Sequence, residues 1–317
     1  MEYRHLGRSG LRVSEIGLGS WLTYGGSTGR QEALACIRRA YELGVNFFDT
    51  ADVYQGGEAE RVLGEALRGL PRSSYVLATK AFWPVGEGPN DRGLSRKHLV
   101  ESLEGSLRRL GVDYVDLFYC HRFDPETPLE ETLRALEDMQ RQGKVLYAGV
   151  SEWSAQQMAE ALHIQRSRGW APIVADQPHY NLLAPEIEEE ILPFCAREGV
   201  GVVAYSPLAQ GVLAGRYRPG ERPPADSRAG RSGPAGSMAR YLEPEALERA
   251  GRLARLAAEA GLSPARFALA WVLRRPEVSS ALVGASRLEQ VEENVSASGL
   301  RLPEELWEQA RNLAAGF

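Results

Sequence analysis

The strongest constraint on the fold is a regular alternation between two kinds of segment. Short apolar runs, each the length of a single strand, are separated by longer stretches in which apolar residues recur with the period of a helix. Strands that alternate with helices favour a parallel sheet, because a helix carries the chain back between parallel strands. The eight apolar runs are residues 16–20, 45–48, 75–79, 114–119, 145–150, 172–176, 199–206 and 279–284.

Eight such units without a linker or a composition shift predict an α/β fold, a single (β/α)8 TIM barrel that spans residues 1–317 as one domain. A β-hairpin is expected at residues 2–17, and a long irregular loop at 216–238, after the seventh strand, where a loop of this length is typically functional or disordered. A dinucleotide-binding doubly wound sheet is disfavoured, because GLGSWLTYGG lacks the Gly-x-Gly-x-x-Gly pattern. Helices are expected in residues 30–44, 95–111, 128–143, 154–169 and 185–199, several of which end in glycine.

Composition limits the classes of partner. The formal net charge is −5 with acidic and basic residues interspersed, so there is no basic stripe for a nucleic acid and no polybasic segment for a membrane surface. No apolar run reaches the roughly 18 residues of a membrane-spanning helix, and the charged N-terminus is unlike a signal peptide. We therefore expect a cytoplasmic protein without membrane insertion. The three cysteines lie far apart, which predicts buried free thiols and neither a disulfide framework nor a metal site.

Four titratable residues are predicted to meet at one end of the barrel. In (β/α)8 barrels the loops that follow the strands build the active site. Asp49 ends the second apolar run, Tyr54 lies in the loop after it, Lys80 ends the third run and His121 ends the fourth. Each residue taken alone also fits a structural role, as a turn, packing or buried polar residue.

Together these residues form a coherent acid system. A tyrosine hydroxyl, with a reference pKa of about 10, is a poor proton donor at neutral pH. A lysine ammonium beside it favours the phenolate, and a carboxylate can hold that lysine in place. A histidine can donate a hydrogen bond to a carbonyl oxygen that gains negative charge. Lysine supplies just three of the 37 basic residues, so Lys80 is a candidate for a place where a guanidinium would not serve.

The motifs around these residues resemble those of the aldo-keto reductases. The four residues lie in NFFDTADVY, ATK and DLFYCHRFD, and similar motifs follow in order from residue 4 to residue 294. The chain most resembles the branch that contains the β subunits of voltage-gated potassium channels and their bacterial relatives. The segments that match this branch are GLGSWLTYGG, ERVLGEAL, RGLSRKHLVESL, YSPLAQGVLAGRY and ALVGASRLEQVEEN.

The resemblance implies a reductase that binds a nicotinamide cofactor across the barrel mouth, without a metal ion. Ser151 and Gln177 match residues that hydrogen-bond the nicotinamide carboxamide, and Tyr205 matches the ring on which the nicotinamide stacks. Residues 206–211 match the loop that wraps the pyrophosphate. The cofactor-binding residues implied in this way are Ser20, Trp21, Asp49, Ser151, Gln177, Tyr205, Ser206, Pro207, Leu208, Ala209, Gln210, Gly211, Arg216, Arg228, Gly284, Ser286, Gln290, Glu293 and Asn294.

Two places depart from the family pattern. Glu152 stands where the family usually has Asn or Arg, and a carboxylate cannot donate a hydrogen bond to the carboxamide oxygen. Many members read the 2′-phosphate of NADPH with a Lys-Ser pair and a later Arg, where this chain has Gly284, Ala285 and Gln290. We still expect NADPH to bind more tightly than NADH, because charge-assisted hydrogen bonds to phosphate are strong. The contacts expected to replace the missing ones come from Arg228, Ser286 and Arg287.

Aromatic residues near the same rim predict a mainly apolar substrate pocket with the polar groups at its base. The alternative is that these rings only pack the top of the barrel. The residues expected to line the pocket are Trp21, Tyr24, Tyr54, Trp83, His121 and Phe123.

The expected activity is NADPH-dependent reduction of an aldehyde or ketone to an alcohol, with Tyr54 as the general acid. The expected partner is a small carbonyl compound, and homo-oligomer formation is left open. One alternative is a slow regulatory or sensor protein like the channel β subunits, which carry asparagine where this chain has His121. A second alternative is a hydrolytic barrel that uses Asp49 and Asp124 as a carboxylate pair.

Overall fold

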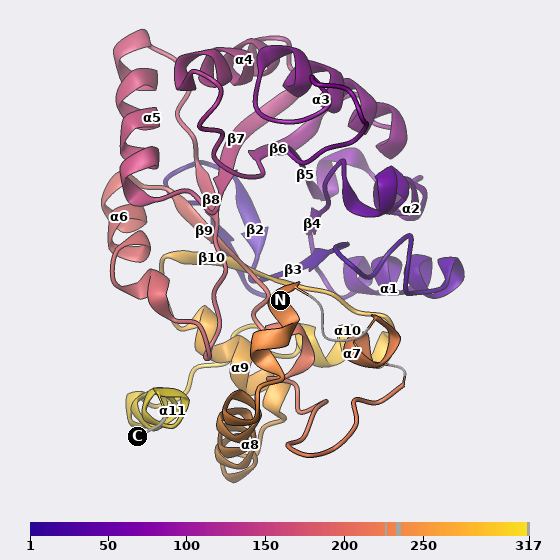
Figure 1. The fold of residues 1–317 in the computed structure, drawn as a ribbon, viewed down its shortest axis with the longest axis vertical. Coiled ribbons are helices and arrows are strands. Elements are labelled where there is room, and N and C mark those ends of the chain that lie inside the picture. The colour runs from indigo at the N-terminus through magenta and orange to yellow at the C-terminus, as the bar shows by residue number, and fades with distance from the viewer. Residues whose placement is uncertain (226, 233–235, 316–317) are drawn as a thin grey trace.

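The computed structural model describes residues 1–225, 227–232 and 236–315 (Figure 1). Its centre is a closed barrel of parallel strands in the order β10-β3-β4-β5-β6-β7-β8-β9. Each strand falls within or overlaps one of the predicted apolar runs, so the predicted (β/α)8 barrel is confirmed. The strands are β3 (Ile16–Gly19), β4 (Phe47–Asp49), β5 (Val76–Ala81), β6 (Val115–Cys120), β7 (Val145–Ser151), β8 (Ala175–Gln177), β9 (Gly201–Tyr205) and β10 (Val278–Val283).

Helices surround the barrel, and the predicted ones occur with one difference. The helix expected from residue 185 begins at Ile191 instead, after a 3-10 turn at Glu186–Glu188. The Glu188 carboxylate binds the Tyr180 hydroxyl and, at 2.7 Å, the Arg274 guanidinium, and these distant contacts hold the turn outside the helix. The helices are α1 (Arg30–Glu42), α2 (Glu58–Leu67), α3 (Arg96–Leu110), α4 (Leu129–Arg141), α5 (Ala155–Arg168), α6 (Ile191–Glu198), α7 (Arg228–Ser232), α8 (Pro244–Glu259), α9 (Pro264–Leu273), α10 (Leu288–Val295) and α11 (Glu304–Ala315).

The predicted N-terminal hairpin, β1 (Tyr3–His5) paired with β2 (Arg12–Ser14), closes the end of the barrel at which the strands begin. Leu6 and Val13 are fully buried there and pack against the side chains inside the barrel. Gly7, with φ of +58°, lies so close to the start of β9 that a Cβ atom would come within 2.3 Å of a backbone oxygen. The opposite end, where the strands finish, is left for the loops that build a site.

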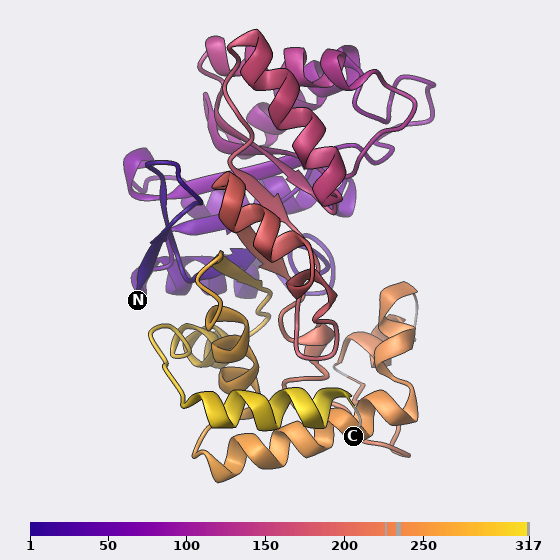
Figure 2. The same cartoon turned by 90° about the vertical axis from the view of Figure 1, so that its left-hand side faces the viewer.

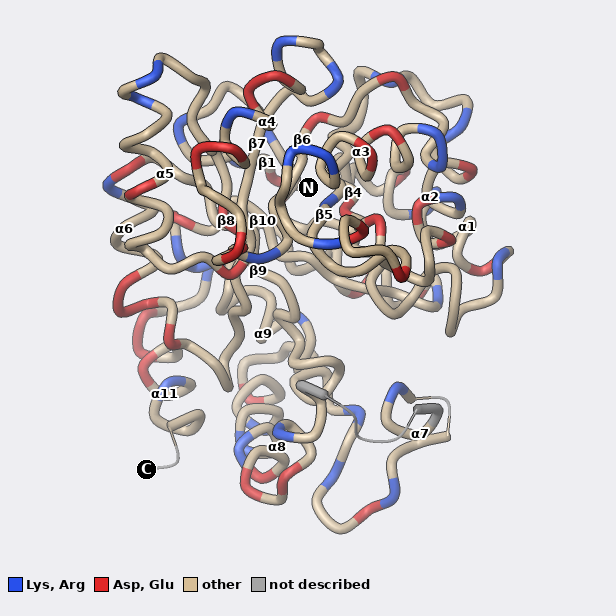
Figure 3. Tube along the Cα trace, turned by 45° about the horizontal axis from the view of Figure 1, so that its top comes forward, with Lys and Arg blue, Asp and Glu red and all other residues tan. Residues whose placement is uncertain are grey.

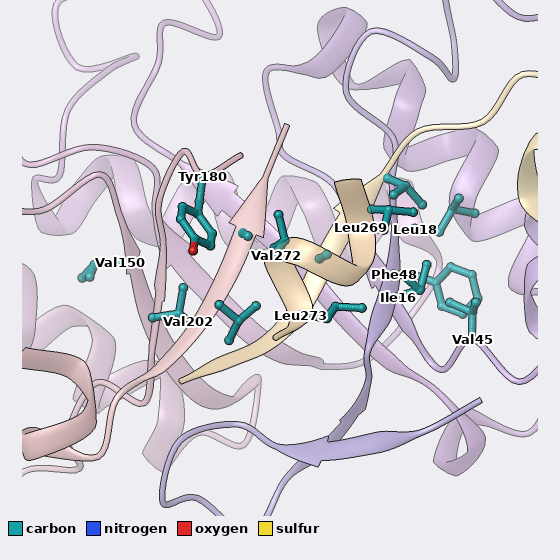
Figure 4. Close-up of a cluster of buried hydrophobic side chains, with 14 of the residues drawn as sticks. Ile16, Leu18, Val45, Phe48, Val150, Tyr180, Val202, Leu269, Val272 and Leu273 are labelled. Carbon is teal, nitrogen blue, oxygen red and sulfur yellow. The ribbon is translucent and has the colours of Figure 1, made fainter. Parts of the chain in front are cut away.

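The buried apolar side chains divide into two layers. Inside the barrel lie Phe47, Ala78, Leu117 and Val203, among others. Between the barrel and the helices lies a larger cluster, and Figure 4 shows members of it from strands, loops and α9. Successive residues of one strand alternate between the layers, as side chains on a strand must. The labelled members are Ile16, Leu18, Val45, Phe48, Val150, Tyr180, Val202, Leu269, Val272 and Leu273.

Several segments lie outside the eight-unit pattern. α11 packs beside α8 below the barrel (Figure 2). The long segment predicted as a loop at 216–238 contains α7 and the start of a 3-10 turn at Gly236–Tyr241, and its residues 226 and 233–235 lie outside the described part of the chain. Basic and acidic residues are interspersed over the trace (Figure 3), as the sequence indicated. In the described ranges, no helix combines the length and the apolar character that crossing a membrane requires.

Candidate active site

The alternation of side chains along each strand explains why titratable groups meet at the barrel mouth. Phe47 points into the barrel, so Asp49, two residues later on β4, points the same way. The same step of two leads from Ala78 to Lys80 on β5. It leads from Tyr119 on β6 to the residue just after that strand, His121. On β8 it leads from Ala175 to Gln177.

The four predicted catalytic residues are in contact. The Lys80 ammonium, which has no exposed surface, donates to the Asp49 carboxylate and, at 2.7 Å, to the Thr50 carbonyl. It also lies 3.5 Å from the Tyr54 hydroxyl. That hydroxyl lies 3.5 Å from His121 Nε2, so it stands between a cation and an imidazole. Distances of this length weaken a hydrogen bond, and such contacts commonly tighten when a ligand binds.

Burial decides the protonation states of these groups. It raises the pKa of Tyr54 well above its usual value, and the nearby Asp49 charge raises it further. The predicted effect of Lys80, which favours the phenolate, is therefore opposed by burial and by the Asp49 charge. Asp49 pairs with the lysine and weakens its effect, and the Tyr54 side chain is partly buried. Tyr54 is thus a protonated hydroxyl at neutral pH, which is the form that a general acid needs.

Burial also raises the pKa of Asp49 and lowers that of Lys80, and their mutual attraction opposes both changes. The pKa of His121 is held well below its usual value by burial and then by the charges of Lys80 and Arg122. His121 is consequently a neutral imidazole. Its Nδ1 atom is buried without a hydrogen-bond partner among the described residues, and Nε2 faces Tyr54.

A chain of hydrogen bonds extends this group across the mouth. Gln177 Nε2 donates to the second oxygen of Asp49 at 3.0 Å, and the Ser151 hydroxyl donates to the Gln177 carbonyl at 2.8 Å. Arg122 Nη1 lies 2.5 Å from the His121 carbonyl oxygen and 3.4 Å from Ser151 Oγ. Arg122 was not among the site residues predicted from the sequence. Its place directly after His121, at the end of a strand, was the available signal.

The backbone at the mouth is strained in a way that fits a ligand site. In the described part of the chain, every non-glycine residue with φ in the left-handed region lies in a loop that follows a strand at this end. Three of them fall within the predicted pyrophosphate loop after β9. The residues are Leu22, Gln55, Glu152, Ser206, Ala209 and Gln210.

Side chains beside this loop could hold an extended anionic cofactor. Trp21 and Tyr205 meet edge to face with ring centroids 6.5 Å apart. The Arg228 guanidinium lies 5.8 Å above the Trp21 ring and donates to Gln210 Oε1 at 3.2 Å. Burial lowers the pKa of Arg228, and the charge has no carboxylate partner among the described residues. The buried Ser20 hydroxyl likewise lacks a partner there. Arg228 could therefore bind a phosphate of a nucleotide, and the Ser20 hydroxyl could bind a polar group such as an amide.

The residues implied for the adenosine end cluster at the start of α10. Gln290 Oε1 accepts from the Ser286 backbone at 2.9 Å and from its hydroxyl at 3.2 Å. Gly284 lies beside the loop after β3, because a Cβ atom there would approach Thr23 Oγ1 to 2.8 Å. Asn294 is buried, and Glu293 is partly buried. Arg216 follows the pyrophosphate loop, and it is partly buried.

The aromatic residues predicted for the substrate pocket occupy two different environments. Trp21 and Trp83 keep 36% and 39% of their surface exposed at the rim. The Trp83 ring meets the His121 ring at 6.4 Å, and Phe123 meets Trp153 at 5.0 Å. Tyr24 differs from the expectation, since it is 1% exposed and belongs to the core cluster around α1. Helix packing against the barrel covers this ring, which the sequence alone does not show.

The carboxylates of Glu152 and Asp124 accept hydrogen bonds from nearby loop residues, which the sequence alone does not show. Glu152, in a left-handed conformation, accepts from the His179 amide at 2.6 Å, and it also bonds Tyr205. Asp124 accepts from the Leu94 amide at 2.7 Å and from the Thr127 hydroxyl, also at 2.7 Å. The pKa of Asp124 is lowered by these bonds, against the effect of burial. Asp124 therefore organises its own loop, and the structure does not support the carboxylate pair of a hydrolase.

The comparison with known proteins agrees with this geometry. The model of the Aldo/keto reductase family matches residues 15–315. A probable voltage-gated potassium channel subunit beta from Oryza sativa subsp. japonica is 45% identical over 300 residues, which cover 94% of this chain and 91% of the relative. A protein described in the same words from Arabidopsis thaliana is 43% identical with the same coverage of 94% and 91%. A putative voltage-gated potassium channel subunit beta from Schizosaccharomyces pombe is 43% identical and covers 93% and 87% of the two chains. The chain belongs to the aldo/keto reductase family.

Proposed function

We propose that this protein reduces aldehydes or ketones to alcohols with NADPH, and that Tyr54 is the proton donor. The observation that carries the proposal is the position of the Tyr54 hydroxyl, 3.5 Å from Lys80 Nζ and 3.5 Å from His121 Nε2. A buried hydroxyl in this place can give its proton to a carbonyl oxygen as that oxygen gains charge. The nicotinamide cofactor supplies the hydride when it is bound.

Each neighbour of Tyr54 has a distinct task in this proposal. Lys80 stabilises the negative charge that Tyr54 takes on as its proton leaves, and Asp49 holds Lys80 in place. His121 is neutral, so it can donate one hydrogen bond to the carbonyl oxygen without supplying a competing proton.

The residues that would hold the cofactor surround this centre. Ser151 and Gln177 would bind the carboxamide, the Tyr205 ring would support the nicotinamide, and the loop of residues 206–211 would enclose the pyrophosphate. The preference for NADPH over NADH belongs to the proposal as well, and Arg228 is the main cation offered to the 2′-phosphate end. The expected cytoplasmic location also stays a prediction.

A second candidate is a cofactor-bound regulatory protein with slow turnover. The relatives named as potassium channel subunits favour it. The imidazole of His121 favours the enzyme, because it offers a donor close to the proposed proton donor. A channel or another protein partner would be compatible with either candidate.

Oxidation of NADPH in the presence of 4-nitrobenzaldehyde tests the proposal. We expect one alcohol formed for each NADPH consumed at ordinary enzymatic rates. Tyr54→Phe should lower turnover by about 10²–10⁴-fold, since general acid catalysis contributes that much, while NADPH affinity stays within a few-fold. Tyr41→Phe is a matched control, because this tyrosine bonds Ser74 at 2.8 Å on the outside of the barrel. Near-normal turnover in Tyr54→Phe would remove Tyr54 from the mechanism, and no oxidation by the natural protein would favour the regulatory candidate.

A further inference from the structure

Arg122 places a guanidinium at the barrel mouth beside the proposed reaction centre. Its Nη1 atom is 2.5 Å from the His121 carbonyl oxygen and 3.4 Å from the Ser151 hydroxyl. Its Cζ atom lies 5.6 Å above the ring of Trp83, whose surface is 39% exposed. The side chain is thus fixed on one face by an aromatic ring and along one edge by two oxygens.

The remaining edge of this guanidinium forms no hydrogen bond with the described residues. Both hydrogen bonds use Nη1, and in the described part of the chain no hydrogen bond involves Nε or Nη2 of Arg122. An arginine carries five N–H donors in a planar fork that matches a carboxylate. A fork that is held by stacking and leaves one edge open is prepared for an anion from outside the chain.

Among the described residues, no carboxylate forms an ion pair with Arg122. The Asp49 carboxylate is held by Lys80 and Gln177. Burial raises the pKa of Asp176 well above its usual value, which favours the uncharged form of that side chain. Glu152 accepts from the His179 amide. Many surface arginines, such as Arg96 and Arg166, pair with carboxylates, but Arg122 does not do so with any described residue.

Burial likewise raises the pKa of Asp52, to about 7, so about half of this carboxyl is protonated at neutral pH. The Arg122 guanidinium contributes a positive field on the side of His121 and Trp83. Such a field attracts an anionic substrate and repels a cationic one.

We infer that Arg122 is a specificity-determining residue that binds an anionic group of the substrate, so that the substrates are carbonyl compounds with a carboxylate or a similar anion. The inference rests on the proposed carbonyl reduction. The substrate body lies against Trp83, its carbonyl faces Tyr54 and His121, and its anionic group meets the open edge of Arg122. An aromatic or short apolar body of about one ring joins the two ends.

A purely structural role for Arg122 makes a different prediction. If its contacts with His121 and Ser151 only hold those residues in place, its loss lowers turnover of charged and neutral substrates alike. The ratio between the two substrates separates these roles, because intrinsic reactivity cancels when the same ratio is compared between proteins.

The test measures kcat/KM for 4-formylbenzoate and for its neutral isostere 4-formylbenzamide, with NADPH as the reductant. We expect Arg122→Gln to lower the charged-to-neutral ratio by about tenfold, as expected for the loss of a charge-assisted hydrogen bond. Arg122→Lys should retain part of the preference, because it keeps the charge and loses the fork. Arg134→Gln is the matched control, since Arg134 stacks over Trp170 at 5.5 Å on the outer face of the barrel and should leave the ratio unchanged.

A second measurement covers the case in which Arg122→Gln does not fold. Raising the ionic strength from about 0.05 to about 0.5 M should lower the ratio for the natural protein, because salt screens a charge at an open mouth. An equal loss for both substrates in Arg122→Gln overturns the inference, as does a ratio that is independent of salt. Turnover of the amide without preference for the acid would overturn this inference alone. Turnover of neither compound would instead count against the proposed reductase.

Discussion

The two ends of the barrel each contain a buried ion pair, and the two pairs are built in opposite ways. At the floor, Glu15 is fully buried and accepts from Arg4 Nε at 2.8 Å, from the Ser298 hydroxyl at 3.0 Å and from the Gly299 amide at 2.8 Å. Arg4 in turn donates to three backbone carbonyls at the start of β10 and the end of α9. The floor pair is therefore saturated with hydrogen bonds.

At the mouth, the Lys80–Asp49 pair is surrounded by groups that are not saturated. The Tyr54 hydroxyl has 3.5 Å contacts, and His121 Nδ1 has no partner among the described residues. The pKa values differ accordingly: hydrogen bonds lower that of Glu15 despite the opposing effect of burial, whereas burial raises that of Asp49. One end uses charge to fix the fold, and the other keeps charge available for a ligand.

The largest expected effects are a loss of stability in Glu15→Gln and a loss of turnover in Asp49→Asn. Breaking the floor pair leaves Arg4 charged, because arginine does not lose its proton, so Glu15→Gln should lower the free energy of unfolding by about 3 kcal/mol. Asp49→Asn should cost less stability, since burial already lowers the pKa of Lys80 and the lysine can become neutral. It should nevertheless lower turnover by roughly 10²-fold, because Lys80 loses its position and charge. Urea unfolding and NADPH oxidation measure the two effects.

The difference between the floor and mouth ion pairs would be contradicted if the two variants behaved alike. A loss of turnover in Glu15→Gln comparable to that in Asp49→Asn would show that the floor pair also serves the site. A larger loss of stability in Asp49→Asn would show that the mouth pair carries the fold. Each result would remove the division of tasks between the two ends.

Asp52, at the mouth, provides a further test, because its titration makes the stability of the protein depend on pH. Burial, and next the charge of Glu60, raises the pKa of this carboxyl to about 7. Because the folded pKa is raised, the stability it contributes is complete below about pH 4, the unfolded pKa, and is lost as the pH rises to about 7. As the pH rises from 5 to 8, the stability of Asp52→Asn relative to the natural protein should thus increase by about 3 kcal/mol. Thermal unfolding at several pH values, with the exposed Asp113→Asn as the control, measures this gain, and a constant difference would contradict it.

His121→Asn tests whether the unsaturated groups of the mouth serve chemistry. We expect single-turnover oxidation of bound NADPH by 4-nitrobenzaldehyde to slow by at least about tenfold, because the shorter amide donates at poorer geometry. NADPH affinity should stay the same. The exposed His163→Asn on α5 is the matched control. Equal rates for His121→Asn and the natural protein would favour the regulatory candidate.

The smallest expected effect concerns the outer part of the mouth. Arg228→Ala should lower the ratio of NADPH to NADH affinity by about fivefold, since a partly exposed cation is screened by solvent. Ser286→Ala should lower the same ratio less, because a neutral hydroxyl is replaced. Fluorescence titration with both nucleotides measures the ratio. If neither variant changes it, the proposed reading of the 2′-phosphate is wrong.

The sequence predicted the barrel because its evidence is local. Strand length, helical period and terminal glycines are properties of neighbouring residues, and all eight apolar runs became strands. The contact of Asp49, Tyr54, Lys80 and His121 also followed from local rules, since strand ends of one barrel meet at one rim. The fifth expected helix was wrong at its start, because Tyr180 and Arg274 hold Glu188 from distant parts of the chain.

By itself, the sequence determined the order of strands and helices, the end of the barrel that carries the site and the residues delivered to it. The tertiary structure decided how those residues behave. It buried Tyr24, raised the pKa of Tyr54 through burial and the Asp49 charge, and left one edge of Arg122 without a hydrogen bond to the described residues. The Gln177–Asp49 bond joins residues 128 positions apart. Burial and charge act through space, so a pattern of neighbours along the chain cannot specify them.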